Sequence, residues 1–369
     1  MPKYQRRSAS PGGIVTRAEA LCRTEFLAML KATVKSLLAH SAQWSGRLRA
    51  HEARRDGALS ILCFHRVLPA AQRAAYFDPV LAITPEAFDT ICATLARHAR
   101  VLPLAEAVAA VEADGPDAQR VVALTFDDGY RDNALHAAPI LERHGLRASF
   151  YVVADLLGTP QPPWYDRLGR VVQELSAQGQ DVRADGTPAA SADQAAPPTA
   201  VVAAAKQLDA AGRRAFLEEL ESRLPAPPQF DAPDQLMDFE LLRALQDAGH
   251  EIGSHSCSHE ILPLLDDAAL RHEIQESKRA LEAGGLKVRS FCFPNGDYDA
   301  RCLEWVREAG YEAALTTQPG VNPAGASRFE LHRHFVHQDS WAGPLGGISP
   351  AWVRFVTAGL NDASSEEAA

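Results

Sequence analysis

The chain of 369 residues predicts an α/β fold in which parallel strands alternate with helices. Three observations support this prediction. Short apolar runs recur between stretches of helical periodicity, several of these stretches end at a glycine, and polar residues directly follow the strand candidates. The strand candidates are enough for either a barrel or a doubly wound sheet. A hydrophobic content of 46% against 23% charged residues provides for a large core and excludes a wholly disordered protein.

The N-terminal segment differs from the rest of the chain. Residues 1–16 are expected to form a flexible leader, and a helical apolar stripe follows at Leu27, Leu30, Val34, Leu37, Leu38, Trp44 and Leu48. Residues 1–55 hold 11 lysines and arginines but only 3 acidic residues, although the whole chain has a net charge of −10. We expect this basic helix to pack on the folded domain. Contact with an anionic membrane surface and, last, a transit peptide are the alternatives.

The elements of the α/β part follow in order from residue 59. Strands are predicted over residues 59–64, 121–126, 148–153, 250–254, 288–293 and 313–316. Helices are predicted over residues 85–96, 133–144, 206–224, 235–248 and 301–309. The alternation breaks near Gly158, and the residues 186–205, rich in alanine and proline, are expected to form a mobile insertion.

Composition also argues against several classes of protein. An acidic chain is a poor general binder of nucleic acid. No apolar stretch approaches the ~18–20 residues of a membrane span, and no signal-peptide pattern begins the chain. The six cysteines include no CxxC pair, so buried free thiols are expected rather than a disulfide framework. We therefore expect a cytoplasmic protein, with peripheral contact at the inner membrane surface left open.

The first candidate for chemistry is the pair Asp127 and Asp128. Both follow the strand predicted over 121–126 and precede Gly129, which permits a turn that brings the two carboxylates to one site. Parallel α/β folds place their functional groups at such strand ends. Taken alone, the motif could equally be a solvated Asp-Asp-Gly turn.

The second candidate is the pair His255 and His259, which follows the strand predicted over 250–254. Two histidines four residues apart can lie on the same side of a helical turn and bind one metal ion, although one packed and one exposed histidine is the commoner outcome. One aspartate and two histidines would leave coordination positions open for water and substrate, and the other aspartate could act as a base. Cys257 is expected to face away from both histidines.

Two further strand ends carry candidates. The turn Pro294-Asn295-Gly296 frees backbone N–H groups that can stabilise an oxyanion, with an ordinary turn as the alternative. His65 follows the first strand, where it fits the mouth of a barrel, with a purely structural histidine as the alternative.

In this order, the motifs resemble the polysaccharide deacetylase family (carbohydrate esterase family 4, the NodB-homology domain). The matching segments are LTFDDGY at 124–130, GSHSCSH at 253–259 and FPNGDY at 293–298, supported by segments 64–67, 247–253 and 307–311. The resemblance covers residues 58–340, with 158–230 as a variable insertion. It implies three parts: a basic leader and helix (1–57), a catalytic domain (58–345), and a C-terminal helix with a flexible acidic tail (346–369).

The resemblance implies a distorted (β/α)7 barrel with an N-terminal helical arm, a helical insertion and one divalent metal ion, expected to be zinc. By the family pattern Asp127 is the catalytic base, and the metal ligands are Asp128, His255 and His259. The backbone N–H of Asn295, directly after Pro294, matches the oxyanion donor. Tyr130 and His65 are further candidates for substrate contact.

The late segment departs from the commonest family pattern, in which one arginine orients the base and a late histidine is the general acid. Here residues 331–334 read Leu-His-Arg-His, similar to a subgroup with Leu-Pro-Arg-Ile. Arg333 is the matched position and the expected catalytic-site residue, with His334 or His332 as runner-up. In a strand both histidines would face away from Arg333. An exposed polar edge is the alternative for this segment, and the general acid stays open.

The expected function is a metal-dependent hydrolase that removes acetyl groups from an N-acetylated saccharide, either an exopolysaccharide, a cell-envelope glycan or its precursor. The expected partner is thus an acetylated carbohydrate and not nucleic acid. The alternatives are another C–N hydrolase acting on a small amide or ureide, and a catalytically silent carbohydrate-binding protein. A glycoside hydrolase is disfavoured because adjacent aspartates do not flank a glycosidic bond at the required ~5 Å or more.

Overall fold

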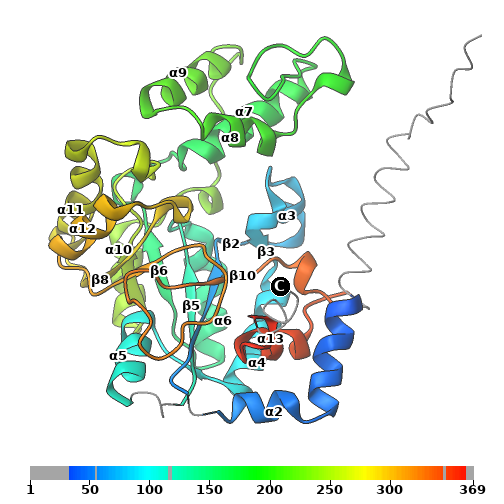
Figure 1. Ribbon diagram of the computed structural model, residues 1–369. Helices are drawn as coiled ribbons and strands as arrows, with labels where there is room; N and C mark the ends of the chain where they lie inside the picture. The colour runs from blue at the N-terminus through cyan, green and yellow to red at the C-terminus, as the bar shows by residue number, and fades with distance from the viewer. Residues whose placement is uncertain (1–32, 55, 115–118, 344–345, 363–369) are drawn as a thin grey trace, which may run out of the picture.

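The structure is a computed structural model that describes residues 33–54, 56–114, 119–343 and 346–362 (Figure 1). A curled parallel sheet forms its centre, and helices surround the sheet. The expected leader, the positions Leu27 and Leu30 of the N-terminal stripe, and residues 363–369 of the acidic tail lie outside the described residues. Within these ranges no helix combines the length and apolarity needed to cross a lipid bilayer.

The strands follow the predicted apolar runs closely. They pair in the order β10-β1-β5-β6-β7-β8-β9, all parallel, and β4 pairs beside β5. Their bounds are β1 Leu59–Phe64, β4 Arg100–Val101, β5 Val121–Phe126, β6 Ser149–Val152, β7 Glu251–Ser254, β8 Val288–Cys292, β9 Ala313–Leu315 and β10 His334–Phe335. A separate short ladder pairs β2 Arg66–Val67 with β3 Ala82–Ile83.

The sheet curls so strongly that one segment, residues 331–335, pairs with the strands at both of its edges. At one edge β10 pairs with β1, where Leu62 lies opposite His334. At the other edge Leu315 of β9 forms an isolated parallel bridge with Leu331, shortly before β10. A doubly wound sheet has no such closure, so the expected distorted (β/α)7 barrel is confirmed.

Both faces of the barrel are buried, which explains why the strands are continuous apolar runs rather than alternating ones. One face of β1 and β5 points into the barrel with Leu59, Ile61, Val121 and Ala123. The other face lies under the helices, where Phe126 stacks between Phe64 and Phe150 at centroid distances of 5.2 and 5.0 Å.

The helices predicted to start at residues 85 and 301 begin within one residue of those positions, and those predicted from 206 and 235 begin four residues later. The helices over 104–114 and 267–283 were not predicted. Capping residues define several of the starts. Thr84, Asp238, Asp266 and Asp299 each accept a hydrogen bond from the first turn of the helix that follows. The helices of the barrel are α3 Ala70–Ala75, α4 Pro85–His98, α5 Leu104–Asp114, α6 Ala138–Arg143, α10 Phe239–Asp247, α11 Asp267–Ala283 and α12 Ala300–Glu308. The helix predicted over 133–144 differs at its start, where Asn133–Ala137 form a π-helical turn before α6.

The insertion is an ordered helical unit, so the expected mobile segment over 186–205 is wrong in its second half. Its helices are α7 Trp164–Ala177, α8 Pro198–Ala205 and α9 Ala210–Glu221. Val201, Val202 and Ala205 of α8 are buried in a hydrophobic cluster shared by all three helices. The alanines of α8 therefore serve close helix packing rather than disorder. Figure 1 shows this unit, in green, above one end of the barrel.

The N-terminal arm packs on the domain, as expected. Residues 33–44 are helical and turn at Gly46, which has a positive φ of 76°, into α2 Arg47–Glu52. Glu52 pairs at 2.7 Å with Arg354 of the C-terminal helix α13 Pro350–Thr357. The arm and α13 therefore lie together beside the barrel, near α4 (Figure 1).

Candidate active site

The carboxyl ends of the strands meet at the barrel mouth beneath the insertion. Asp127 and Asp128 follow β5, His255 follows β7, and His65 follows β1. They line a cavity of about 170 Å³ together with residues of the barrel loops and of the insertion: Phe77, Asp78, Leu81, Tyr165, Thr199, Val202, Ala203, Lys206, His259, Phe293, Asn295 and Thr317. Strand ends far apart in the sequence thus build one pocket.

Asp128, His255 and His259 are arranged as the ligands of one metal ion. Asp128 Oδ1 lies 3.5 Å from His255 Nε2 and 3.4 Å from His259 Nε2. Two ligands on a tetrahedral ion at zinc distances stand about 3.4 Å apart. Asp128 Oδ1 is buried and has no hydrogen-bond partner among the described residues, a need that a cation would satisfy. The three side chains therefore fit a divalent metal, zinc among others.

The backbone at this site adopts a conformation that side chains rarely take. In the described ranges, the non-glycine residues with positive φ are Asp128, Ser256, His259 and Asn295, at 74°, 67°, 60° and 55°. All four lie in the strand-end loops of the site. Such strain persists where the surrounding structure enforces it, and it is typical of functional sites. The two histidines meet through an irregular loop, so the expected helical turn between them is wrong.

Buried polar groups hold His255 ready as a neutral ligand. Its Nδ1 lies 2.7 Å from the carbonyl oxygen of Cys292, so Nδ1 carries the proton and Nε2 is free to bind a metal. Burial lowers the pKa of His255 to about 4. His259 packs beside Tyr165, with ring centroids 4.9 Å apart. These contacts fix both rings before a metal binds.

A buried carboxylate from α11 holds the loop between the two histidines. Glu273 accepts hydrogen bonds from the backbone N–H groups of Cys257 and Ser258, both at 3.0 Å, and from the Ser258 hydroxyl at 2.5 Å. Cys257 is buried and, as expected, is not part of the ligand group. Glu273 thereby sets the path of the chain from His255 to His259.

Asp127 is held by a bidentate ion pair with Arg333. Arg333 Nη1 and Nη2 each lie 2.8 Å from one carboxylate oxygen, and both side chains are buried. Arg333 Nε donates to the carbonyl of Thr316, which fixes the guanidinium. Burial would raise the pKa of Asp127, but the arginine outweighs it and lowers the pKa to about 2. Asp127 is therefore ionised at all ordinary pH values.

Two thiols complete the surroundings of Asp127. Cys63 and Cys292 contact its Oδ2 at 3.7 and 3.5 Å. Burial raises the pKa of both thiols well above the usual value, so both are neutral weak donors to the carboxylate. Cys63, Cys92, Cys257, Cys292 and Cys302 are all free and buried, as the sequence predicts, and Cys22 lies outside the described residues.

The turn after β8 places Asn295 in the pocket. Asn295 has a left-handed backbone, and none of the backbone hydrogen bonds found in the described ranges uses its N–H group. Its Oδ1 accepts a 2.6 Å hydrogen bond from Lys206 Nζ at the end of the insertion helix α8. Pro294 is buried and does not line the cavity, so its contribution is to end the strand.

His65 faces the same cavity from the opposite side, as expected for the barrel mouth. Its ring lies 5.0 Å from that of Phe335, and its Nδ1 is buried without a hydrogen-bond partner among the described residues. Asn133, in the π-helical turn, donates to the carbonyl oxygen of His65 at 3.1 Å. The histidine is thus positioned with a ring nitrogen available at the site.

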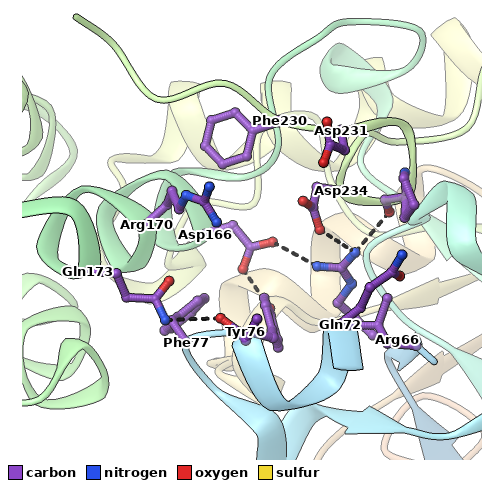
Figure 2. Close-up of a pocket in the computed structure, with 13 residues that line it drawn as sticks. Arg66, Gln72, Tyr76, Phe77, Asp166, Arg170, Gln173, Phe230, Asp231 and Asp234 are labelled. Carbon is purple, nitrogen blue, oxygen red and sulfur yellow. Dashed lines mark hydrogen bonds and ion pairs between the residues drawn. The ribbon is translucent and has the colours of Figure 1, made fainter. Parts of the chain in front are cut away.

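Tyr130 does not line the cavity, contrary to expectation. It is fully buried, and its hydroxyl donates to Asp166 at 2.8 Å. Figure 2 shows the neighbouring cavity of about 160 Å³, where Asp166 also accepts from Tyr76 at 2.6 Å and faces Arg66 at 3.9 Å. Burial raises the pKa of Asp166 to about 6, against the opposing effect of Arg66. This network joins the barrel to the start of α7, next to Tyr165.

His334, the runner-up in the late segment, is also absent from the cavity lining. It pairs in β10 opposite Leu62, and strand alternation turns it away from Arg333. Burial lowers its pKa, with Asp362 of the C-terminal segment acting in the other direction. Arg289, on β8, pairs with Glu312 at the surface. Arg333 is therefore the arginine of the site.

Comparison with known proteins identifies the family. The family model described as polysaccharide deacetylase matches residues 114–207 and 227–314. These segments contain the aspartate pair, both histidines and the Pro-Asn-Gly turn. The chain belongs to the polysaccharide deacetylase family. Membership supports the expected enzyme class, a hydrolase acting on carbon–nitrogen bonds.

Individual relatives agree with this assignment. YxkH of Bacillus subtilis (strain 168), whose name places it among the polysaccharide deacetylases, is 34% identical over 221 residues. The match covers 60% of this chain and 53% of YxkH, so the chain spans about half the length of that relative.

Two solved structures share the fold. The deacetylase PplD of Streptococcus pyogenes, in complex with acetate, matches with a TM-score of 0.52 and 17% identity, covering 78% of this chain and 95% of its own. IcaB from Ammonifex degensii matches with a TM-score of 0.50 and 18% identity, covering 82% and 98%.

Sequence analysis missed Lys206, Glu273 and Asp166. Lys206 and Asp166 lie in the insertion, where no motif indicated contact with the barrel. Glu273 lies on the buried face of α11. An acidic residue on the apolar side of a helix is rarely buried unless it has a partner, so this position could have been recognised in the sequence.

Proposed function

We propose that this protein is a metal-dependent deacetylase of an N-acetylated saccharide of the exopolysaccharide or cell-envelope type. One observation carries the proposal: three candidate metal ligands, here called the metal-binding triad, stand directly beside a carboxylate that is not needed as a ligand. Asp128, His255 and His259 would hold the ion, and Asp127, held by Arg333, would act on the attacking water. A divalent ion bound there would polarise the acetyl carbonyl and lower the pKa of that water.

Asp127 is suited to the role of base because Arg333 both orients it and keeps it ionised. The bidentate pair uses one lone pair on each carboxylate oxygen and leaves others free to accept a proton. A carboxylate with a low pKa is a weak base. A bound metal ion would lower the pKa of the water and so reduce the difference between the pKa values of the water and of Asp127. The carboxylate would accept the water proton as the new carbon–oxygen bond forms.

The other groups of the pocket complete the reaction. The free N–H group of Asn295 would donate to the oxyanion of the tetrahedral intermediate. The leaving amine needs a proton when the carbon–nitrogen bond breaks, and His65 is the pocket histidine that is not a ligand. We assign it the role of proton donor, which in this chain would replace the late histidine of other family members.

The shape of the pocket supports a small or terminal acetylated unit. The insertion lines the cavity with Thr199, Val202, Ala203 and Lys206, so the metal-binding triad lies in a pocket of about 170 Å³. Such a volume suits a small group such as the acetamido group of one sugar unit. An internal unit of a long polymer would have to pass beneath α8.

The test is acetate release from a panel of N-acetylated glycans, oligosaccharides and small amides, with and without a chelator. The proposal expects chelator-sensitive release from a saccharide that returns when zinc or another divalent ion is restored. Release from a small non-sugar amide alone would favour the other C–N hydrolase. Release that a chelator leaves unchanged would contradict the proposed metal.

A further inference from the structure

The N-terminal arm presents an apolar face to solvent. The described residues expose eight large hydrophobic side chains, and four of them belong to the helix of residues 33–44: Val34, Leu37, Leu38 and Trp44. Leu37 is 65% exposed and Trp44 87%. Their spacing places them on one side of the helix, which we call the outer face. Scattered exposed hydrophobics are normal, whereas half of them on one short helix is a patch.

The opposite side of the same helix is already in use. Ser36, Ala39 and Ala42 are buried against the domain, and Lys35 lies 5.2 Å from the ring centre of Trp352 on α13. Small residues let the helix pack closely there. The inner face therefore fixes the orientation of the arm, and the outer face is left available for a second contact.

Basic residues follow this helix along the chain, in α2 and directly after it. Arg47, Arg49 and Arg54 are exposed, and no carboxylate in the described ranges forms an ion pair with them. Residues 1–55 hold 11 basic against 3 acidic residues, whereas the complete chain is acidic by 10 charges. An apolar helix face ending in a tryptophan, with adjacent arginines, has the chemistry of a helix that lies in the interface of an anionic bilayer.

We propose that the outer face docks this protein on an anionic membrane surface, with the leucines and Trp44 in the interfacial layer and the arginines on lipid headgroups. A second copy of the chain fits the face less well, because an isologous dimer would bring two basic arms together. The proposal is independent of the deacetylase reaction. It would hold the enzyme beside a membrane-associated substrate.

The test uses the full chain and sedimentation with vesicles of phosphatidylcholine containing about one third phosphatidylglycerol. We expect binding to these vesicles, weaker binding to pure phosphatidylcholine, and loss of binding as salt rises. The double variant Leu37→Glu/Leu38→Glu is expected to reduce the vesicle partition coefficient at least about tenfold. Leu264→Glu is the matched control: Leu264 is 53% exposed but lies on the barrel, so binding should be unchanged.

A second measurement does not depend on the double variant folding. Trp44 fluorescence should shift to the blue on addition of anionic vesicles, and Trp44→Phe should abolish the shift. The proposal is overturned if wild type does not sediment with vesicles, or if Leu37→Glu/Leu38→Glu, shown to be folded by circular dichroism, binds as well as Leu264→Glu. It is also overturned if the wild type is a dimer and the double variant becomes a monomer with no change in vesicle binding.

Discussion

Replacing Arg333 by glutamine tests how Asp127, the proposed base, is kept ionised. In the wild type, the pKa of Asp127 is lowered from 3.8 to about 2 although the side chain is buried. That difference corresponds to about 2 kcal/mol in favour of the carboxylate. Without the guanidinium, the raising effect of burial is opposed only by His255 and His65, so the pKa of Asp127 should rise. The pH below which kcat/KM declines should then rise into the range where the enzyme can be assayed.

The assay is the pH dependence of kcat/KM for acetate release, with metal content and circular dichroism measured on the same samples. Breaking a buried pair costs about 3–5 kcal/mol of stability, so Arg333→Lys provides a milder variant that keeps the charge. Arg289→Gln, at the surface pair with Glu312, is the control and should keep the wild-type profile. A folded, metal-loaded Arg333→Gln enzyme with an unshifted acid limb would refute the reasoning.

Three further predictions concern the surroundings of the metal site. Glu273→Gln keeps the size of the side chain but weakens the hydrogen bonds that hold the ligand loop, so metal affinity, measured by competition with a chelator, should fall about 10–100-fold. The control Glu276→Gln, at a pair with Arg279 on the same helix, should not change the affinity. Gly253→Ala should destabilise the fold by at least about 1–3 kcal/mol in denaturant unfolding, since a Cβ there would lie 2.4 Å from the buried ring of Tyr151; wild-type stability would show that the ring can move. The metal-free protein should lose about 3 kcal/mol of its free energy of unfolding as the pH falls from 6.5 to about 4, because His255 becomes protonated in the unfolded chain but not in the folded one. His255→Gln should reduce this dependence of stability on pH. An equal dependence in both proteins would contradict a lowered pKa for His255.

The parallel α/β fold could be predicted from the sequence because local and global signals agree, whereas the choice of a barrel rested on the resemblance to the family. The continuous apolar runs of β1 and β5 are buried on both faces, as parallel strands in a barrel require. Asp127, Asp128, His255 and His259 could be placed near each other because parallel strands direct their carboxyl ends to one side. Arg333 followed from the resemblance of the late segment to a subgroup of the family, and strand alternation separated it from His334.

Other features depended on contacts that no local pattern reveals. The alanine-rich stretch before Lys206 reads as disorder by composition, yet α8 is stabilised by close packing on α7 and α9. Tyr130 follows the aspartate pair, but the turn at Gly129, with a φ of 83°, directs its side chain to Asp166 and away from the cavity. Such directions are set by backbone geometry that depends on the whole fold.

The central claim is that adjacent aspartates have different roles, Asp128 as metal ligand and Asp127 as base. The most direct test is to measure bound metal and acetate release together in Asp127→Asn and Asp128→Asn. The structure predicts that Asp127→Asn retains metal near one equivalent per chain but loses activity, whereas Asp128→Asn loses both. Metal loss in Asp127→Asn with retention in Asp128→Asn, or substantial activity in either variant, would contradict the account.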